Sequence, residues 1–236
     1  MLASALGAIA LVMIGVGALY QYSGTLDHTG PSRVQNRQLE TIVMQAEQGN
    51  AAAQYQLGLR YQSGDGVPPL ASEAIEWLNR AAQQGHAGAQ LDLGLAYLDY
   101  GNETDQPDLK QASHWLTRAA EQGEAEAQYL LGTLYSKGHG VIQDYMQAAQ
   151  WFEKAADAGH ADAMYHLGMM YATGEGVAKD RVQAYVWFNL AAAAGDHSAV
   201  IAREEVAGLL SPEQLAQGQA RSRDLDKQQA VVSPSR

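Results

Sequence analysis

The sequence predicts an all-α fold, a solenoid of stacked helix-turn-helix repeats, from three features that recur along the chain. Leu-Gly pairs stand at residues 57–58, 93–94, 131–132 and 167–168, each followed by a tyrosine three residues later. Tryptophans stand at 77, 115, 151 and 187, and glycines at 49, 85, 123, 159 and 195. This period of 36 or 38 residues is typical of arrays in which each unit buries its apolar face against the next.

The composition excludes several classes of function. The 236 residues include no cysteine, so the chain has neither a disulfide framework nor a thiol nucleophile. The formal net charge is −11, and residues 51–196 carry most of it, with 8 Lys/Arg against 18 Asp/Glu. An acidic surface repels phosphate backbones, which argues against binding of nucleic acid.

The N-terminal segment predicts a membrane anchor over residues 1–20. Residues 2–20 contain no charged side chain, and a helix of that length spans about the 30 Å of a bilayer's hydrocarbon core. A cleaved signal peptide is the alternative, although the apolar run is longer than usual and no basic residue precedes it. A buried helix or a wrongly assigned start is a third possibility. The polar residues 21–38, which contain Gly30-Pro31-Ser32, predict a linker.

The array itself is predicted over residues 39–199. Residues 39–48 have helical apolar spacing and end at Gly49, which indicates a half-repeat. In the first helix of each full repeat, the positions of Ala53, Leu57 and Tyr61 form one stripe that must be buried. The glycine after each leucine lacks a Cβ, so the second helix can pack closely. We place the four full repeats at residues 51–86, 87–124, 125–160 and 161–196.

Turn and cap residues divide each repeat into two helices. Gly-x-Gly-Val turns at 64–67, 138–141 and 174–177 supply backbone conformations that a side chain penalises. Three aspartates, at 108, 144 and 180, each precede a glutamine by three residues, which predicts reciprocal capping of the second helix. The glycines at 85, 123, 159 and 195 should end the second helices in the left-handed conformation.

Two repeats depart from this pattern. The first has Leu70 where the others have the capping aspartate, so we expect its second helix to begin at Ser72. The second repeat is two residues longer and has residues 99–107 in place of the Gly-x-Gly-Val turn. We read these residues as a solvated insertion.

After Gly195 the repeat pattern fades. Residues 198–210 are amphipathic, and Ser211-Pro212 followed by Gln214 restarts a helix with a serine cap. We therefore expect capping helices over residues 200–228, because a polar terminal helix closes the open end of a solenoid. Residues 229–236 are predicted to form a disordered tail.

The recurring Ala, Leu-Gly, Tyr, Gly-x-Gly-Val, Asp, Trp, Ala-Ala and Gly positions resemble the Sel-one-like repeat, a relative of the tetratricopeptide repeat. The resemblance covers about residues 39–199. It implies a right-handed α-solenoid whose first helices line a concave groove. It also implies that partner peptides bind in this groove.

The candidate binding residues lie on the face of each first helix opposite the buried stripe. That face should be polar if it only meets water, yet aromatic and aliphatic residues stand there. The candidates are Tyr55, Gln56, Leu59, Leu91, Asp92, Leu95, Tyr129, Leu130, Tyr165, His166 and Met169. Two interpretations are open: these side chains contact a partner, or the tyrosines pack between adjacent repeats.

The sequence contains no recognisable catalytic motif. It has no phosphate-binding loop, no His-Glu-x-x-His and no nucleophile-elbow serine. The seven histidines show no ligand spacing, so we expect no metal and no cofactor. We therefore predict a non-enzymatic scaffold for a protein partner, with no small-molecule substrate, and the acidic surface favours basic or neutral peptides.

The resemblance leaves two alternatives for function and suggests a location. Some relatives take part in polysaccharide export, so a scaffold for envelope polysaccharide is one alternative. Cysteine-rich relatives are associated with β-lactam hydrolysis, although this chain lacks their cysteines. We expect the chain to be anchored in a bacterial cell envelope with the solenoid in the periplasm, or secreted there after signal cleavage.

Overall fold

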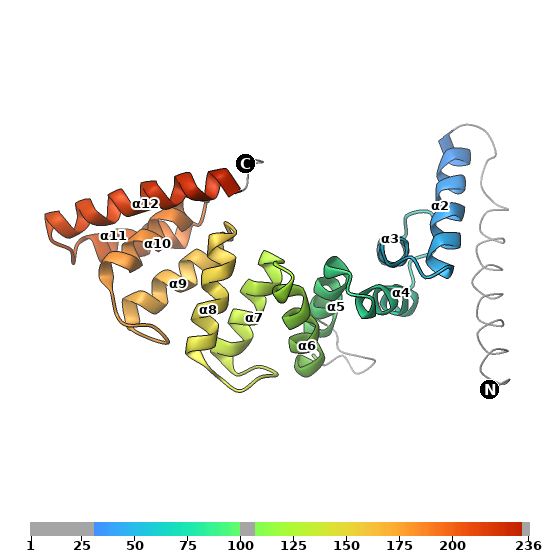
Figure 1. The fold of residues 1–236 in the computed structure, drawn as a ribbon, viewed down its shortest axis with the longest axis horizontal. Helices are drawn as coiled ribbons and strands as arrows, with labels where there is room; N and C mark the ends of the chain where they lie inside the picture. The colour runs from blue at the N-terminus through green and yellow to red at the C-terminus, as the bar shows by residue number, and fades with distance from the viewer. Residues whose placement is uncertain (1–30, 100–106, 233–236) are drawn as a thin grey trace. The chain divides into compact units, whose positions relative to one another are not determined.

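The computed structural model describes residues 31–99 and 107–232, and every regular element in these ranges is an α-helix. The chain divides into two compact units, Met1–Ala89 and Gln90–Arg236, which we call unit 1 and unit 2. Unit 1 contains α2 (Pro31–Glu47), α3 (Ala51–Ser63), α4 (Ala71–Gln83) and the start of α5 (Ala87–Asp99). Unit 2 contains the rest of α5, α6 (Leu109–Glu121), α7 (Ala125–Lys137), α8 (Tyr145–Asp157), α9 (Ala161–Thr173), α10 (Arg181–Ala193), α11 (His197–Ala207) and α12 (Pro212–Val232) (Figure 1).

The helices form pairs that follow the predicted repeats. We call α3, α5, α7 and α9 the A helices and α4, α6, α8 and α10 the B helices. In unit 2 each helix from α6 to α11 packs against the next one along the chain, as in an α-solenoid. The handedness of the superhelix stays a prediction.

The recurring leucines and glycines hold each pair together, as predicted. The leucines at 57, 93, 131 and 167 are at most 1% exposed. A Cβ on the glycine that follows each of them would lie 2.6 to 2.9 Å from a side-chain carbon of the B helix. These B-helix residues are Leu78, Leu116, Phe152 and Phe188. The missing Cβ therefore lets an apolar side chain cross directly over the A-helix backbone.

The second glycine of the turn joins one repeat to the repeat before it. Gly140 and Gly176 have φ angles of +73° and +72°, and a Cβ on either would overlap a backbone carbonyl of the preceding B helix. These carbonyls belong to Leu109 and Tyr145. Gly66 has a similar φ of +76°, but a Cβ there would have no neighbour closer than 3.6 Å. The same glycine is thus a turn residue in the first repeat and a packing residue in the third and fourth.

The glycines that end the B helices have the predicted left-handed conformation. Their φ angles are +89° at Gly85, +95° at Gly123, +90° at Gly159 and +102° at Gly195. Each helix therefore ends where the sequence pattern places its end.

The aspartate caps are present, but the predicted reciprocal bond from glutamine is wrong. Each aspartate carboxylate accepts a bond of 3.0 to 3.1 Å from the N–H of the glutamine three residues later. The aspartate's own N–H donates instead to a tyrosine carbonyl on the A helix of its repeat. These pairs are Asp108 with Tyr97, Asp144 with Tyr135 and Asp180 with Tyr171, at 2.9 to 3.0 Å. Because this donor is already bonded, the glutamine side chain has no role in the cap.

The first repeat keeps the backbone bond without the aspartate. The Leu70 N–H donates to the Tyr61 carbonyl at 3.0 Å, and α4 begins at Ala71 rather than at the expected Ser72. No side chain caps this helix. The tyrosine carbonyl therefore sets the start of the B helix, and the aspartate only strengthens it.

At both ends of the array the observed helices extend beyond the predicted bounds. Helix α2 begins at Pro31, inside the predicted linker, since proline is well tolerated in the first turn of a helix. Helix α12 continues to Val232, past the predicted end at 228, because Gln229 near its end is buried and hydrogen-bonded. The predicted anchor over residues 1–20 lies outside the described residues. Among the helices that are described, none is long and apolar enough to cross a membrane.

A glutamine on the A helix links neighbouring repeats. Gln54 donates from Nε2 to the Ala46 carbonyl at 3.0 Å, and Gln128 donates to the Ala120 carbonyl at 3.1 Å. The side-chain oxygen of Gln54 in turn accepts from Gln84, which follows the B helix. In unit 2 an equivalent bond of 2.7 Å runs from Gln122 to Gln90. These buried amides fix how one helix pair sits on the next.

The third repeat lacks one member of this arrangement. Ala158 stands at the position of Gln84 and Gln122, so the buried Oε1 of Gln128 has no hydrogen-bond partner among the described residues. A buried acceptor without a donor costs stability. The third repeat therefore carries a small internal defect.

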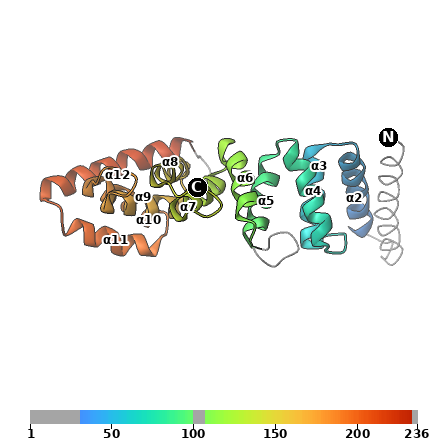
Figure 2. The same cartoon turned by 90° about the horizontal axis from the view of Figure 1, so that it is seen from below.

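The C-terminal end closes the array in a different way. Met164 replaces the A-helix glutamine of the fourth repeat, so it cannot donate to the Ala156 carbonyl. Gln229 of α12 supplies that bond at 2.9 Å. Helix α12 packs along α10, which lies between α11 and α12 (Figure 2). A Cβ on Gly218 would lie 2.7 Å from the ring of Tyr185, so the two helices are in close contact.

Helix α11 has the sequence register of a fifth A helix but does not receive a B helix. Ala199 lies 36 residues after Ala163, and both are fully buried. The position of the packing glycine holds Glu204, whose side chain is 72% exposed. A carboxylate at this position opposes close packing of an apolar helix. Helix α12 accordingly packs on α10 instead.

Candidate functional site

The structure divides the predicted binding residues between the two units. Tyr55, Gln56 and Leu59 lie on α3 in unit 1, and the other eight lie on α5, α7 and α9 in unit 2. Gln56 and Met169 are exposed, and Met169 is 39% exposed. The other predicted residues are half-buried, namely Tyr55, Leu59, Leu91, Asp92, Leu95, Tyr129, Leu130, Tyr165 and His166.

Two of the tyrosines lie against the histidines that end their repeats, directly before the next A helix. The Tyr55 and His86 rings have centroids 4.3 Å apart, and those of Tyr129 and His160 are 4.5 Å apart with an angle of 20° between their planes. The Tyr129 ring also lies 5.8 Å from that of His166 in the fourth repeat, so packing between repeats, one of the two interpretations of these tyrosines, is part of the structure. Their binding of a partner stays a prediction.

The stacked histidines also cap A helices. The Nδ1 atom of His86 accepts from the Ala89 N–H at 3.3 Å, and that of His160 accepts from the Ala163 N–H at 3.4 Å. An Nδ1 atom that accepts a hydrogen bond carries no proton, so Nε2 bears it. In His160 this Nε2 lies 2.9 Å from Glu126 Oε2. His86 and His160 occupy equivalent positions in their repeats, but no pattern in the sequence pointed to this capping role.

Unit 2 gathers a continuous group of side chains from α7 and α9. We call Glu126, Tyr129, Asp162, Tyr165, His166 and Met169 the α7–α9 surface. The His166 ring lies 5.8 Å from Tyr129 and 5.7 Å from Tyr165, measured between centroids, and stacks on the buried Phe152 at 5.1 Å. Asp162 and Met169 are exposed, and the Glu126 side chain is 48% exposed. The rings thus have a buried floor and an edge of exposed acidic and apolar groups.

Burial and neighbouring carboxylates set the protonation of this surface. Burial raises the pKa of the Tyr129 hydroxyl, and Asp162 and Glu126 raise it further. Burial lowers the pKa of His166, with Asp162 and Asp196 acting in the opposite direction. Both rings are therefore neutral at neutral pH, and the net charge of the α7–α9 surface is negative.

One further residue belongs to the series of candidate positions on the A helices, and the repeat pattern did not identify it. Ile201 on α11 lies 36 residues after Tyr165, and it is 63% exposed. It continues the series Tyr55, Leu91, Tyr129 and Tyr165, but it stands beyond the last tryptophan and so beyond the visible repeat. Extending the spacing past Gly195 would have found it.

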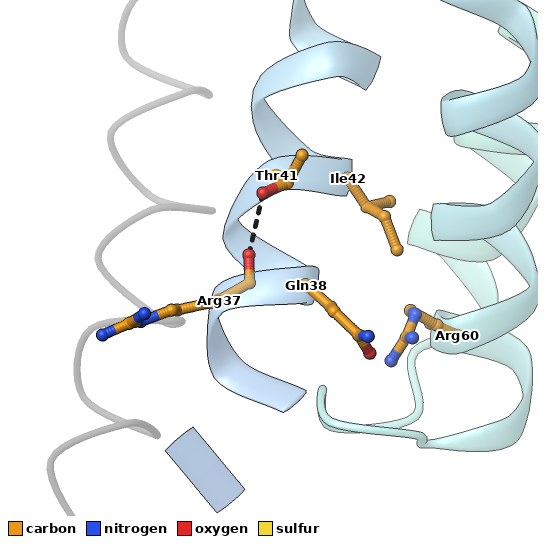
Figure 3. Close-up of a pocket in the computed structure, with 5 residues that line it drawn as sticks. All are labelled: Arg37, Gln38, Thr41, Ile42 and Arg60. Carbon is orange, nitrogen blue, oxygen red and sulfur yellow. Dashed lines mark hydrogen bonds between the residues drawn. The ribbon is translucent and has the colours of Figure 1, made fainter. Parts of the chain in front are cut away.

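Two hollows elsewhere in the described residues carry no comparable arrangement. One of about 380 Å³ lies beside α2 and α3 and is lined by Arg37, Gln38, Thr41, Ile42 and Arg60 (Figure 3). Arg37 points away from Arg60, and Arg60 forms an ion pair with Asp65 at 3.0 Å. The other hollow, of about 530 Å³, is lined mainly by residues at the start of α10, where Asp180 already caps the helix. Neither hollow is lined by an aromatic side chain.

The described residues also contain no group of three or more His, Asp or Glu side chains placed to hold a metal ion. The acidic residues of the insertion in the second repeat lie partly outside the described ranges. The chemistry that the α7–α9 surface offers is therefore aromatic, apolar and acidic contact.

Comparison with known proteins agrees with the repeat pattern. A family model described as the Sel1 repeat matches residues 51–86, 87–124, 125–160 and 161–196. A search of the curated proteins finds no match.

Two solved structures resemble the chain over much of its length. One is c5321, described as a protective antigen present in uropathogenic Escherichia coli strains and displaying an SLR fold, with 33% identity and a TM-score of 0.71. The match covers 91% of this chain and 46% of c5321. The other is a Sel1 repeat protein from Oxalobacter formigenes, with 38% identity and a TM-score of 0.65 over 73% of this chain and 50% of that one. The chain spans about half the length of both relatives.

Proposed function

Because the chain belongs to the Sel1 repeat family, we propose that it is a non-enzymatic scaffold that binds a protein partner, and that the α7–α9 surface is its binding site in unit 2. The observation that carries this proposal is the exposure of Met169 beside the half-buried rings of Tyr165 and His166. A helix face that only met water would carry polar side chains there. Aromatic and methionine side chains beside charged groups are the composition of protein-binding surfaces.

The rigidity of this surface supports the same function. His166 rests on Phe152, and Tyr129 rests on His160, which is itself held by the Ala163 N–H and Glu126. The side chains therefore have little freedom left to lose when a partner binds, and such preorganisation strengthens binding.

A crosslinking experiment tests the site. A photoreactive amino acid is placed at Met169 in one variant of the full chain and at Met146 in another. Met146 is a matched control, because it is also an exposed methionine of unit 2, at 64% exposure, but lies on α8. We expect a discrete crosslinked product in cells from position 169 and none from position 146.

Substitution checks that the crosslink reports binding rather than proximity. Met169→Glu should abolish capture of the crosslinked partner, whereas Met146→Glu should leave it unchanged, with both variants retaining the helical circular-dichroism spectrum. Equal capture by the wild type and the Met169→Glu variant would show that the site lies elsewhere.

We also propose that residues 2–20 tether the scaffold to a membrane of the bacterial cell envelope, with the repeats in the periplasm. The support is the absence of any charged side chain in this segment. The relative from Escherichia coli is described as a protective antigen, which fits an envelope location for a related chain. Membrane fractionation with protease treatment of intact and opened cells tests this: the repeats should resist protease until the outer membrane is opened. Repeats in the soluble fraction of washed, lysed cells would contradict the tether.

A further inference from the structure

The α7–α9 surface carries a pair of carboxylates, Glu126 and Asp162, that unit 1 lacks, and this pair indicates the chemistry of the partner. We infer that the surface holds a lysine or arginine side chain of a peptide, with its cationic head between Glu126 and Asp162 beside Tyr129. This inference rests on the proposed function and names the class of partner for the same site.

Unit 1 contains the same aromatic stack without the carboxylates. Tyr55 lies against His86 with 31° between the ring planes, and Tyr129 stacks on His160 with 20°. The repeat positions of Glu126 and Asp162 are occupied in unit 1 by Ala52 and Gly88. The tyrosine, the capping histidine and the helix start therefore form without either acidic side chain. Glu126 and Asp162 stand in the first turns of α7 and α9, where a negative charge favours the helix, but unit 1 shows that the aromatic contact does not require them.

The two carboxylates lie close to the same ring. Asp162 and Glu126 both lie near enough to the Tyr129 hydroxyl to raise its pKa, and Asp162 stands at the repeat position of Gly88, where a Cβ would lie 3.1 Å from the Tyr55 ring. Glu126, one turn before Tyr129 on α7, bonds to His160. Among the described residues, no lysine or arginine forms an ion pair with Glu126 or Asp162. Two negative charges beside one aromatic ring, with no cation between them, are complementary to a cationic group.

The neighbouring side chains suit the rest of a basic side chain. Lysine and arginine have apolar stems that pack on apolar surface while the head stays with its charged partners. Met169 lies one turn after Tyr165 on α9, and its exposure leaves room for such a stem. Arginine can also donate to both oxygens of a carboxylate at once. A short peptide with one basic residue among apolar residues therefore fits this surface better than an acidic or a wholly polar one.

A peptide library provides the test without knowledge of the natural partner. The probe is a display library of random 12-residue peptides, selected on the immobilised full chain. Three proteins are compared: the wild type, Glu126→Gln/Asp162→Asn, and the control Asp224→Asn/Asp226→Asn. The control removes the same charge from the exposed face of α12. A Tyr165→Ser/Met169→Ser variant tests the apolar part of the surface.

We expect the wild type and the control to enrich peptides with a lysine or arginine next to apolar residues. The affinity for a synthetic enriched peptide should fall about tenfold or more in Glu126→Gln/Asp162→Asn, because each charge-assisted bond contributes more than a neutral one. The fall in the control should be less than twofold.

The outcomes separate this inference from the proposed function. Enrichment of peptides without basic residues, or an equal loss in the control, would overturn the role of the carboxylate pair while leaving the surface as the binding site. No enrichment by the wild type, or enrichment that Tyr165→Ser/Met169→Ser leaves unchanged, would overturn the proposed binding site itself.

Discussion

Within unit 2, an interior junction between repeats and the C-terminal end form the same kind of hydrogen bond to a B-helix carbonyl, but the donor residues differ. In the interior, Gln128 of the A helix donates to the Ala120 carbonyl at the end of the preceding B helix. At the C-terminal end Met164 stands at the position of Gln128, and the side-chain donor to the equivalent carbonyl of Ala156 comes from Gln229, 73 residues along the chain. The comparison shows that the repeat fixes which backbone groups need partners. It does not fix which segment of the chain supplies them.

The tryptophans show the same difference. In the first three repeats a cation three residues later lies over the ring, with Arg80 4.4 Å from Trp77, Arg118 5.3 Å from Trp115 and Lys154 3.8 Å from Trp151, each measured to the ring centroid. The fourth repeat has Leu190 at this position, only 4% exposed. Leu225 of α12 packs against the cluster that contains Trp187 and Leu190. Leu190 therefore takes the place of the cation in the repeat against which α12 packs.

The largest effect should come from the second glycine of the turn. Gly176→Ala places a Cβ against the Tyr145 carbonyl in addition to the left-handed strain, so we expect a loss of about 4 kcal/mol or more in unfolding free energy. Gly66→Ala has the strain without the overlap and should cost only about 1–2 kcal/mol. Urea unfolding followed by circular dichroism measures both. Equal losses would show that the junction between repeats rearranges to accept the Cβ at little cost in unfolding free energy.

The next effect tests the bond that closes the C-terminal end. Gln229→Ala removes the bond from α12 to the Ala156 carbonyl, which keeps its bond from the Gly159 N–H, and we expect a loss of about 1 kcal/mol. Met164→Gln restores the interior arrangement, so it should recover part of this loss in the Gln229→Ala background and be unfavourable in the wild type. A double-mutant cycle measures this coupling. Strict additivity would mean that Gln229 and residue 164 do not serve the same carbonyl.

A gain of stability is expected from repairing the third repeat. Ala158→Gln supplies the donor that Gln84 and Gln122 provide in the first two repeats, so the Gln128 oxygen gains a partner and stability rises by about 1 kcal/mol. Ala194→Gln is the matched control, since it stands at the same position opposite Met164, which has no acceptor amide. Thermal unfolding should show a rise for the first variant only. A similar rise in both would point to helix propensity as the cause.

The smallest effect concerns pH. Burial lowers the pKa of His166 in the folded chain, so the unfolded chain binds the proton more readily. Above its ordinary pKa of 6.5 the residue contributes no pH dependence, and stability falls as the pH drops below that value. His166→Phe keeps an aromatic ring on Phe152 and should flatten the pH dependence of stability between about pH 7 and 5. An unchanged pH dependence in His166→Phe would contradict this assignment.

The sequence predicted those features that obey a local rule repeated in every unit. The leucine stripe, the glycine under the B helix, the aspartate cap and the left-handed glycine all depend on residues within one repeat. The missed features depend on distant groups. The N–H of each capping aspartate bonds to a tyrosine carbonyl rather than to the predicted glutamine side chain. The bond from Gln229 to the Ala156 carbonyl joins residues far apart in the chain, so no local pattern predicts it.

The candidate site was predicted only in part for the same reason. The exposed position of Met169 follows from helical periodicity, and so does the placement of Tyr165 opposite the buried stripe. The contact of Tyr129 with His166 joins two repeats, so the pattern of either repeat alone could not predict it. The repeat positions of Glu126 and Asp162 hold different residues in different repeats. A consensus built from recurring residues omits such positions, although they distinguish the surface of one repeat from that of another.

Helix α12 packs along α10 and bonds to the end of α8, so it spans the last two repeats at once. A duplicated repeat inserted before α7 would leave this arrangement intact. One inserted between α8 and α10 would carry the Ala156 carbonyl away from Gln229. During evolution, therefore, the array can lengthen upstream, while its last two repeats and α12 must be inherited together as one block.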